Sequence, residues 1–83
     1  MGEDKGYIMT VKVFIMENLP QDQSPRDLDD TVNNVFRDLE SVGKRVEVKH
    51  IFDAFEELNK TQDLVIFSNG KVIATRKGLH NYG

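Results

Sequence analysis

The 83-residue sequence predicts a single α/β domain, in which four strands and two helices follow the order β-α-β-α-β-β. Three observations lead to this prediction. Apolar residues recur at helical spacing in one long segment near the middle of the chain. The continuous apolar run Leu64-Val65-Ile66-Phe67 is typical of an interior strand. The dipeptide Asn69-Gly70 follows this run, and Asn-Gly is a strong signal for a two-residue hairpin turn.

The first strand is predicted from Tyr7 to Met16. Val11, Val13 and Ile15 fall on one face of such a strand, because successive side chains of a strand point to opposite faces. The other face is also apolar near the end of the segment, as expected for a strand that is covered on both sides.

The first helix is predicted over residues 24–42. Ser24 can cap the helix, Pro25 suits its first turn, and Asp27 stands where the acid of a capping box would be. Gly43 is a natural stop. The apolar stripe of this helix is expected to consist of Leu28, Val32, Val35, Phe36, Leu39 and Val42.

A second strand is predicted over residues 44–52, because apolar and charged residues alternate there. Asp53 and Glu56 repeat the capping pattern and open a second helix that ends near Lys60. The last two strands form a hairpin, with its second strand at 72–75.

The chain contains no internal repeat, low-complexity tract or domain linker, so one domain is predicted at residues 7–79. Residues 1–6 are polar and contain glycine, and residues 80–83 lack periodicity. Both ends are expected to be disordered tails.

The segment from Leu64 to Gly78 resembles the terminal hairpin of the thioredoxin and glutaredoxin family, and the predicted order of elements resembles the core of that family. The resemblance implies a thioredoxin-like fold with a mixed four-stranded sheet, two helices and the final helix missing. The residues that carry it are Leu64, Phe67, Asn69-Gly70, Val72, Ala74-Thr75 and Gly78.

The departures from the family bear on chemistry. The redox motif Cys-x-x-Cys of the family would fall on Ser24-Pro25-Arg26-Asp27, and its cis-proline on Gln62. This chain has no cysteine, so thiol catalysis and thiolate metal sites are excluded. The resemblance therefore implies a domain without the redox chemistry of its relatives.

Four residues are candidates for binding a ligand: Ser24, Pro25, Arg26 and Gln62. A helix that begins at Ser24 would offer free N–H groups and a positive dipole end, which favour an anion such as glutathione. The simpler role of Ser24 is that of a helix cap. No catalytic residue is predicted.

No metal or cofactor is predicted either. His50 and His80 are too far apart in the sequence to form a recognisable ligand pattern. Two acidic clusters fit helix capping and solvent-exposed faces equally well. They consist of Asp53, Glu56 and Glu57, and of Asp27, Asp29 and Asp30.

The net charge of −3 argues against a nucleic-acid partner, which needs a basic face. Lys71, Arg76 and Lys77 form a small basic cluster, so nucleic-acid binding is kept as a third possibility. The longest apolar segment is too short to cross a membrane and does not have the form of a secretory signal. The chain is therefore predicted to be cytoplasmic.

The predicted sheet has two faces, and two helices would leave part of one face uncovered. A protein partner or a second copy of the chain could cover it, which predicts a non-catalytic protein-binding or scaffold module. Alternatively, the segment Arg76 to Tyr82 folds back, with Leu79 and Tyr82 filling the gap. The competing function is a small anion- or glutathione-binding domain or enzyme that uses Ser24.

Overall fold

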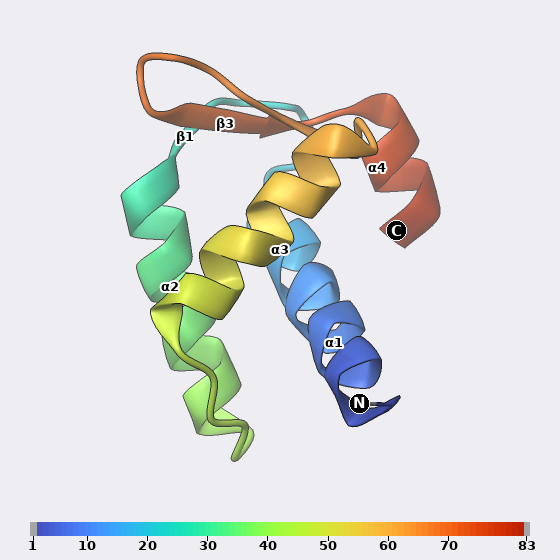
Figure 1. The fold of residues 1–83 in the computed structure, drawn as a ribbon. Coiled ribbons are helices and arrows are strands. Elements are labelled where there is room, and N and C mark those ends of the chain that lie inside the picture. The colour runs from blue at the N-terminus through green and yellow to red at the C-terminus, as the bar shows by residue number, and fades with distance from the viewer. Residues whose placement is uncertain (1, 83) are drawn as a thin grey trace.

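The structure, a computed structural model, describes residues 2–82, and it describes the side chains of residues 8–82. This part of the chain forms four helices and one antiparallel sheet of three short strands (Figure 1). The predicted four-stranded mixed sheet with two helices is therefore wrong. The elements are α1 (Gly2–Asn18), β1 (Arg26–Asp27), α2 (Leu28–Ser41), α3 (Val48–Lys60), β2 (Leu64–Ile66), β3 (Lys71–Ala74) and α4 (Arg76–Tyr82).

The segment predicted as the first strand is part of α1. Val11, Ile15 and Leu19 are buried, and they follow one another at intervals of four residues. This spacing places Val11 and Ile15 on one face of a helix, whereas the alternation of Val11 with Val13 also fitted a strand. Residues 2–6, which were expected to belong to a tail, lie in the first turns of α1, and Met1 lies outside the described residues.

Helix α2 begins four residues later than predicted. Its N-cap is Asp27, whose carboxylate accepts a hydrogen bond from the Asp30 N–H at 3.2 Å. Ser24 and Pro25 therefore precede β1 instead of opening the helix. The predicted stripe is confirmed at its centre, where Val32, Val35 and Leu39 are buried.

Helix α3 contains residues 48–52 of the predicted second strand and the short helix after it, while residues 44–47 belong to the connection between α2 and α3. It begins at Val48, so the predicted start at Asp53 is five residues too late. Ile51, Phe55 and Leu58 recur at intervals of four and three residues, and all three are buried. Helical spacing over the whole segment thus outweighs the short alternation that had indicated a strand.

The predicted hairpin between residues 64 and 75 is confirmed, although its turn is wider than the expected two-residue loop. Leu64 pairs with Ala74 and Ile66 with Val72. The Gly70 N–H donates to the Phe67 carbonyl at 3.0 Å, and Gly70 takes a positive φ of +83°. Residues 67–70 thus form the turn between the two strands, and its last residue is a glycine in the left-handed conformation.

The sheet order β1-β3-β2 is entirely antiparallel, because β3 pairs with β1 on one side and with β2 on the other. A thioredoxin-like sheet requires parallel strands joined by helical crossovers. The thioredoxin-like fold expected from the family resemblance is therefore wrong.

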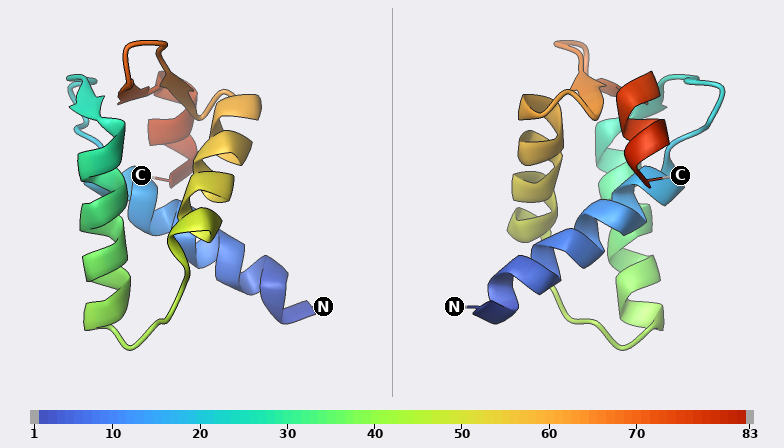
Figure 2. Two further views of the ribbon diagram at one scale, coloured as in Figure 1. Left: turned by 60° about the vertical axis from the view of Figure 1, so that its left-hand side comes forward. Right: turned by 90° about the vertical axis from the view of Figure 1, so that its right-hand side faces the viewer.

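The hydrophobic core lies between α1, α2 and α3, and the sheet covers one end of these three helices (Figure 1). The N-terminal half of α1 projects beyond α3 (Figure 2). The largest fully buried side chains are Phe55, Ile15, Leu39, Ile51, Leu58, Leu64, Val11, Val35 and Val72.

We predict that Asp27→Ala lowers the free energy of unfolding by about 1 kcal/mol, because it removes the side-chain cap of α2. Ser24→Ala is the matched control and should change it by less than about 0.5 kcal/mol. Urea denaturation followed by circular dichroism measures both. A larger loss for Ser24→Ala than for Asp27→Ala would contradict the observed helix start.

Candidate functional site

The residues predicted to bind a ligand lie on both sides of β3. Ser24 and Pro25 precede β1, and Arg26 opens it. Gln62 lies in the turn between α3 and β2, with a positive φ of +65°. Since β3 separates β1 from β2, the structure does not bring Gln62 together with Ser24 in a helix-end site.

The Ser24 hydroxyl organises its own loop. It donates a hydrogen bond to the Asp22 carboxylate at 2.6 Å, and the Ser24 N–H donates to the same oxygen at 3.0 Å. The hydrogen bond from the Ser24 side chain is the main reason why the pKa of Asp22 lies below its usual value. Ser24 is thus neither a helix cap nor a free nucleophile.

Pro25 and Arg26 do line a polar hollow of about 330 Å³ beside the N-terminus of α2. Arg26 and Lys71 supply positive charge there, while Asp27 and Asp30 supply negative charge. Because the Asp27 carboxylate already caps the helix, the positive end of α2 carries its own anion. The hollow is therefore poorly suited to a second anion such as glutathione. Its remaining residues are Asn18, Thr31 and Asn34.

The two histidines and the acidic clusters do not form a metal site. His50 is exposed on α3 and His80 is exposed on α4. Among the described residues, no group of three His, Cys, Asp or Glu side chains could hold a metal ion. The Glu57 carboxylate instead forms an ion pair with the Lys12 ammonium at 3.2 Å, which links α3 to α1.

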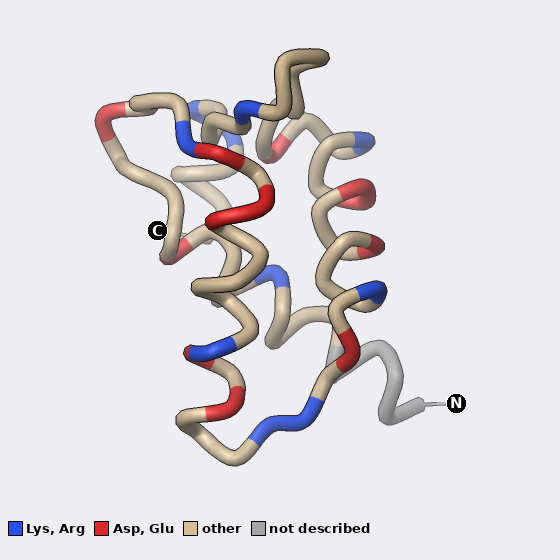
Figure 3. Tube along the Cα trace, turned by 90° about the vertical axis from the view of Figure 1, so that its left-hand side faces the viewer, with Lys and Arg blue, Asp and Glu red and all other residues tan. Residues whose placement is uncertain are grey.

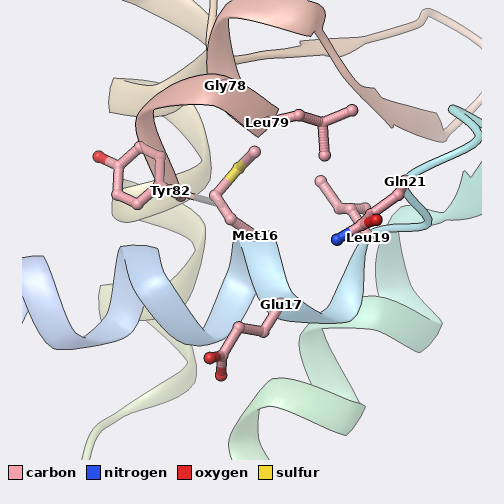
Figure 4. Close-up of a pocket in the computed structure, with 7 residues that line it drawn as sticks. All are labelled: Met16, Glu17, Leu19, Gln21, Gly78, Leu79 and Tyr82. Atoms are coloured by element: carbon pink, nitrogen blue, oxygen red, sulfur yellow. The ribbon is translucent and has the colours of Figure 1, made fainter.

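A hollow of about 160 Å³ with both apolar and polar lining lies between the C-terminal half of α1 and α4 (Figure 4). Met16 on α1 and Leu19, just after α1, point towards α4, and Leu79 points back towards them, while Glu17 points away. The other residues that line this hollow are Gln21, Gly78 and Tyr82.

A second hollow, of about 430 Å³, continues along α1 towards its N-terminus. It is lined by Met9, Val13, Asn81 and Tyr82, and Tyr82 is shared with the first hollow. Met9 is 54% exposed, one of the largest exposures of an apolar side chain in the described residues. We call the two hollows together the α1–α4 groove, defined by Met9, Val13, Met16, Leu19, Leu79 and Tyr82.

Helix α4 forms one wall of the groove and is held in place at Asp63. The buried Asp63 carboxylate accepts hydrogen bonds from Asn81 at 2.9 Å and from the Thr61 hydroxyl. Lys77 donates to the Thr61 carbonyl. Gly78 packs directly on the Asp63 backbone, and Leu79 and Tyr82 pack against the core. The segment from Arg76 thus folds back, as the alternative sequence interpretation expected, and Gly83 lies outside the described residues.

Sequence reasoning missed Met9 and Val13 as surface residues, because it placed them in a buried strand. The signal that could have found them is the mostly apolar composition of residues 7–16, where Thr10 and Lys12 are the exceptions. In a helix, such a segment has apolar residues on every side, and one side remains for a further contact.

Comparisons with known proteins give no relative. No protein-family profile matches this chain, and no curated protein or solved structure matches it. Among the described residues, no helix is both long and apolar enough to cross a membrane.

We predict that Gly78→Ala destabilises the domain by about 3 kcal/mol, the upper range for overpacking. A Cβ atom at this position would overlap the Asp63 carbonyl oxygen and lie 2.7 Å from its carbon. Gly43→Ala is the matched control, since it meets no atom within 4 Å but has a φ of +78°. It should cost only about 1 kcal/mol. Equal thermal denaturation of the two variants would contradict the close contact.

We predict that Ser24→Ala raises the pKa of Asp22 towards the ordinary value of an aspartate, because the hydroxyl hydrogen bond to the carboxylate is lost. A lowered folded-state pKa stabilises the fold above the unfolded-state pKa, and this contribution disappears as pH falls through the folded-state value. NMR titration of the Asp22 carboxyl carbon measures the shift. An unchanged titration in the variant would contradict the role of Ser24.

Proposed function

We propose that this chain is a non-catalytic protein-binding module that binds a protein partner, or a second copy of itself, through the α1–α4 groove. The observation that carries the proposal is the exposure of Met9 beside Val13 and Tyr82, along an open apolar hollow. We also propose that it acts in the cytoplasm, since a chain without cysteine needs no oxidising compartment to fold.

Helix α1 has more apolar surface than the core can cover. A helix that is apolar on every side is normally buried on every side. In this chain Val11 and Ile15 are buried on one side of α1, while Met9 on another side remains exposed to water. Covering this apolar surface would be favourable, at about 25 cal/mol per Å².

The order of the helices and strands is a reason to consider nucleic-acid binding a second time. Helices α2 and α3 are followed by a hairpin that pairs with the strand before α2, an order like that of winged helix-turn-helix domains. In DNA-binding helix-turn-helix proteins the second helix enters the major groove. Here the middle of α3 carries Asp53, Glu56 and Glu57, with Lys49 and Lys60 only at its ends (Figure 3).

Phosphates would be repelled by the middle of α3, and the net charge of −3 adds to this repulsion. Lys71, Arg76 and Lys77, the predicted basic cluster, lie outside α3, on β3 and α4. The anion-binding alternative also loses its basis, because Ser24 does not open a helix. Protein binding through the groove is therefore the function that the geometry supports best.

We predict that a photo-reactive side chain at Met9 forms covalent adducts with a protein in cells that express the chain. The reason is that Met9 lines the groove and is exposed. The control carries the same side chain at Asn33, an exposed residue of α2 outside the groove. Gel electrophoresis and mass spectrometry detect the adducts. Equal adduct formation from Asn33, or none from Met9, would refute the proposed surface.

A further inference from the structure

We propose that Asn69 is a modification site at which the folded chain deamidates itself. In this reaction the Gly70 nitrogen attacks the side-chain amide of Asn69, and the products are aspartate and isoaspartate at position 69. The reaction consumes only water, so it needs neither an enzyme nor a partner. The site is independent of the α1–α4 groove and of the function proposed for it.

The two reacting residues lie in the turn between β2 and β3 (Figure 1). The Asn69 side chain is exposed. A side chain on the residue after an asparagine obstructs the closure of the ring, and Gly70 has none. A Cβ atom at Gly70 would meet no atom within 4 Å, so the rest of the fold does not cover this position either. The pair is therefore accessible both to ring closure and to water.

The side-chain carbonyl of Asn69 is already polarised by the backbone. Its Oδ1 atom accepts a hydrogen bond from the Lys71 N–H at 3.1 Å. Negative charge develops on this oxygen when a nitrogen attacks the carbon to which it is bound. A fixed N–H donor stabilises such a charge, as in the oxyanion holes of acyl-transfer enzymes. The turn thus supports the electrophile of the reaction.

The same turn restrains the attacking nitrogen. The Gly70 N–H donates to the Phe67 carbonyl at 3.0 Å, and this bond must open first. Only the peptide unit between Asn69 and Gly70 has to rotate, because the Gly70 carbonyl belongs to the next unit. Phe67, Ser68 and Asn69 are exposed, and hydrogen bonds of exposed turns open more readily than those of a core. The reaction therefore proceeds by local opening while the core stays folded.

The chemistry balances with one water molecule. The Gly70 nitrogen loses its proton and forms a bond to Cγ of Asn69, and the bond from Cγ to the amide nitrogen breaks. Ammonia leaves with the proton, and a cyclic succinimide remains. Water then opens the ring. Attack at Cγ gives aspartate, whereas attack at the backbone carbonyl gives isoaspartate, in which the main chain runs through Cγ.

The fold places the other asparagines differently. Each of them lies in a helix, where the following N–H is held in the helical conformation and is not free to turn towards the side chain. None of them is followed by glycine. They are Asn18, Asn33, Asn34, Asn59 and Asn81. Asn69 is therefore the one asparagine of this chain at which the sequence and the fold both permit the reaction.

The two products should affect the domain differently. Aspartate leaves the backbone unchanged, and its carboxylate accepts the Lys71 N–H more strongly than an amide does. Isoaspartate lengthens the main chain by one methylene group directly before Gly70. This displaces Gly70, whose carbonyl accepts from the Leu28 N–H at 2.8 Å and whose N–H closes the turn. Isoaspartate should therefore loosen the contact between the hairpin and the start of α2.

The first test follows the purified full-length chain during prolonged incubation at neutral pH. Peptide mapping by mass spectrometry and labelling by an isoaspartyl methyltransferase locate the product. We expect isoaspartate at position 69 and none at Asn33, an exposed asparagine of α2. Asn69→Gln should lose the signal, because its longer side chain would have to close a larger ring. The chain unfolded in urea shows that the product is detectable.

The same incubation in low concentrations of urea separates local opening from global unfolding. Global unfolding becomes more frequent with each addition of urea, whereas the opening of one exposed turn changes little. We expect a nearly constant rate at position 69 below the unfolding transition. A rate that rises in proportion to the unfolded fraction, or a folded chain that does not react while the unfolded chain does, would overturn the proposal.

Thermal denaturation tests the effect of the products. Asn69→Asp carries the new charge without the longer backbone, and it should melt within about 2 °C of the unmodified chain. The isoaspartyl form, separated by ion-exchange chromatography, should melt about 5 °C lower, as expected when turn hydrogen bonds are lost. Equal melting of the two forms would contradict the assigned effect of isoaspartate on the hairpin.

Discussion

The packing of one side of α1 between α2 and α3 is the constraint on which the rest of the structure depends. Val11, Ile15 and Leu19 fill the centre of the core, and the sheet covers the end of the three helices. Because residues 8–16 of α1 carry apolar side chains on more than one side of the helix, burying this side leaves Met9, on a second side, outside the core. Helix α4 covers the C-terminal part of that second side, and the open part is the feature from which the proposed function follows.

The parts of the fold that could be predicted are those in which a local signal has one structural meaning. Asn69-Gly70 predicted the hairpin, and the long stripe at Val32, Val35 and Leu39 predicted most of α2. The predictions that failed concern segments whose apolar residues fit both the spacing of a strand and the spacing of a helix. Val11, Val13 and Ile15 alternate as in a strand, yet Val11, Ile15 and Leu19 recur as in a helix, and the longer pattern prevailed through core packing.

The candidate site could not be predicted for a different reason. The groove depends on α4 folding back, and this requires the close contact between Gly78 and the Asp63 backbone. These two residues are far apart in the sequence, and no local pattern connects them. Two of the four predicted site residues, Pro25 and Arg26, do line the same hollow. Because α2 begins at Leu28, however, Ser24 does not lie at a helix N-terminus, which was the reason for predicting that it binds an anion.

The short junction between β3 and α4 links the register of the hairpin to the orientation of α4, which forms one wall of the α1–α4 groove. Only Thr75 separates Ala74, the last residue of β3, from Arg76, the first residue of α4. A slip of one residue in the pairing of β3 would turn α4 by about 100° about its axis, because helical residues are spaced about 3.6 to a turn. A residue with a side chain would then replace Gly78 against Asp63. The turn itself is fixed at Gly70, whose carbonyl accepts a hydrogen bond from the Leu28 N–H at 2.8 Å. A change in the length of β3 would dismantle one wall of the groove.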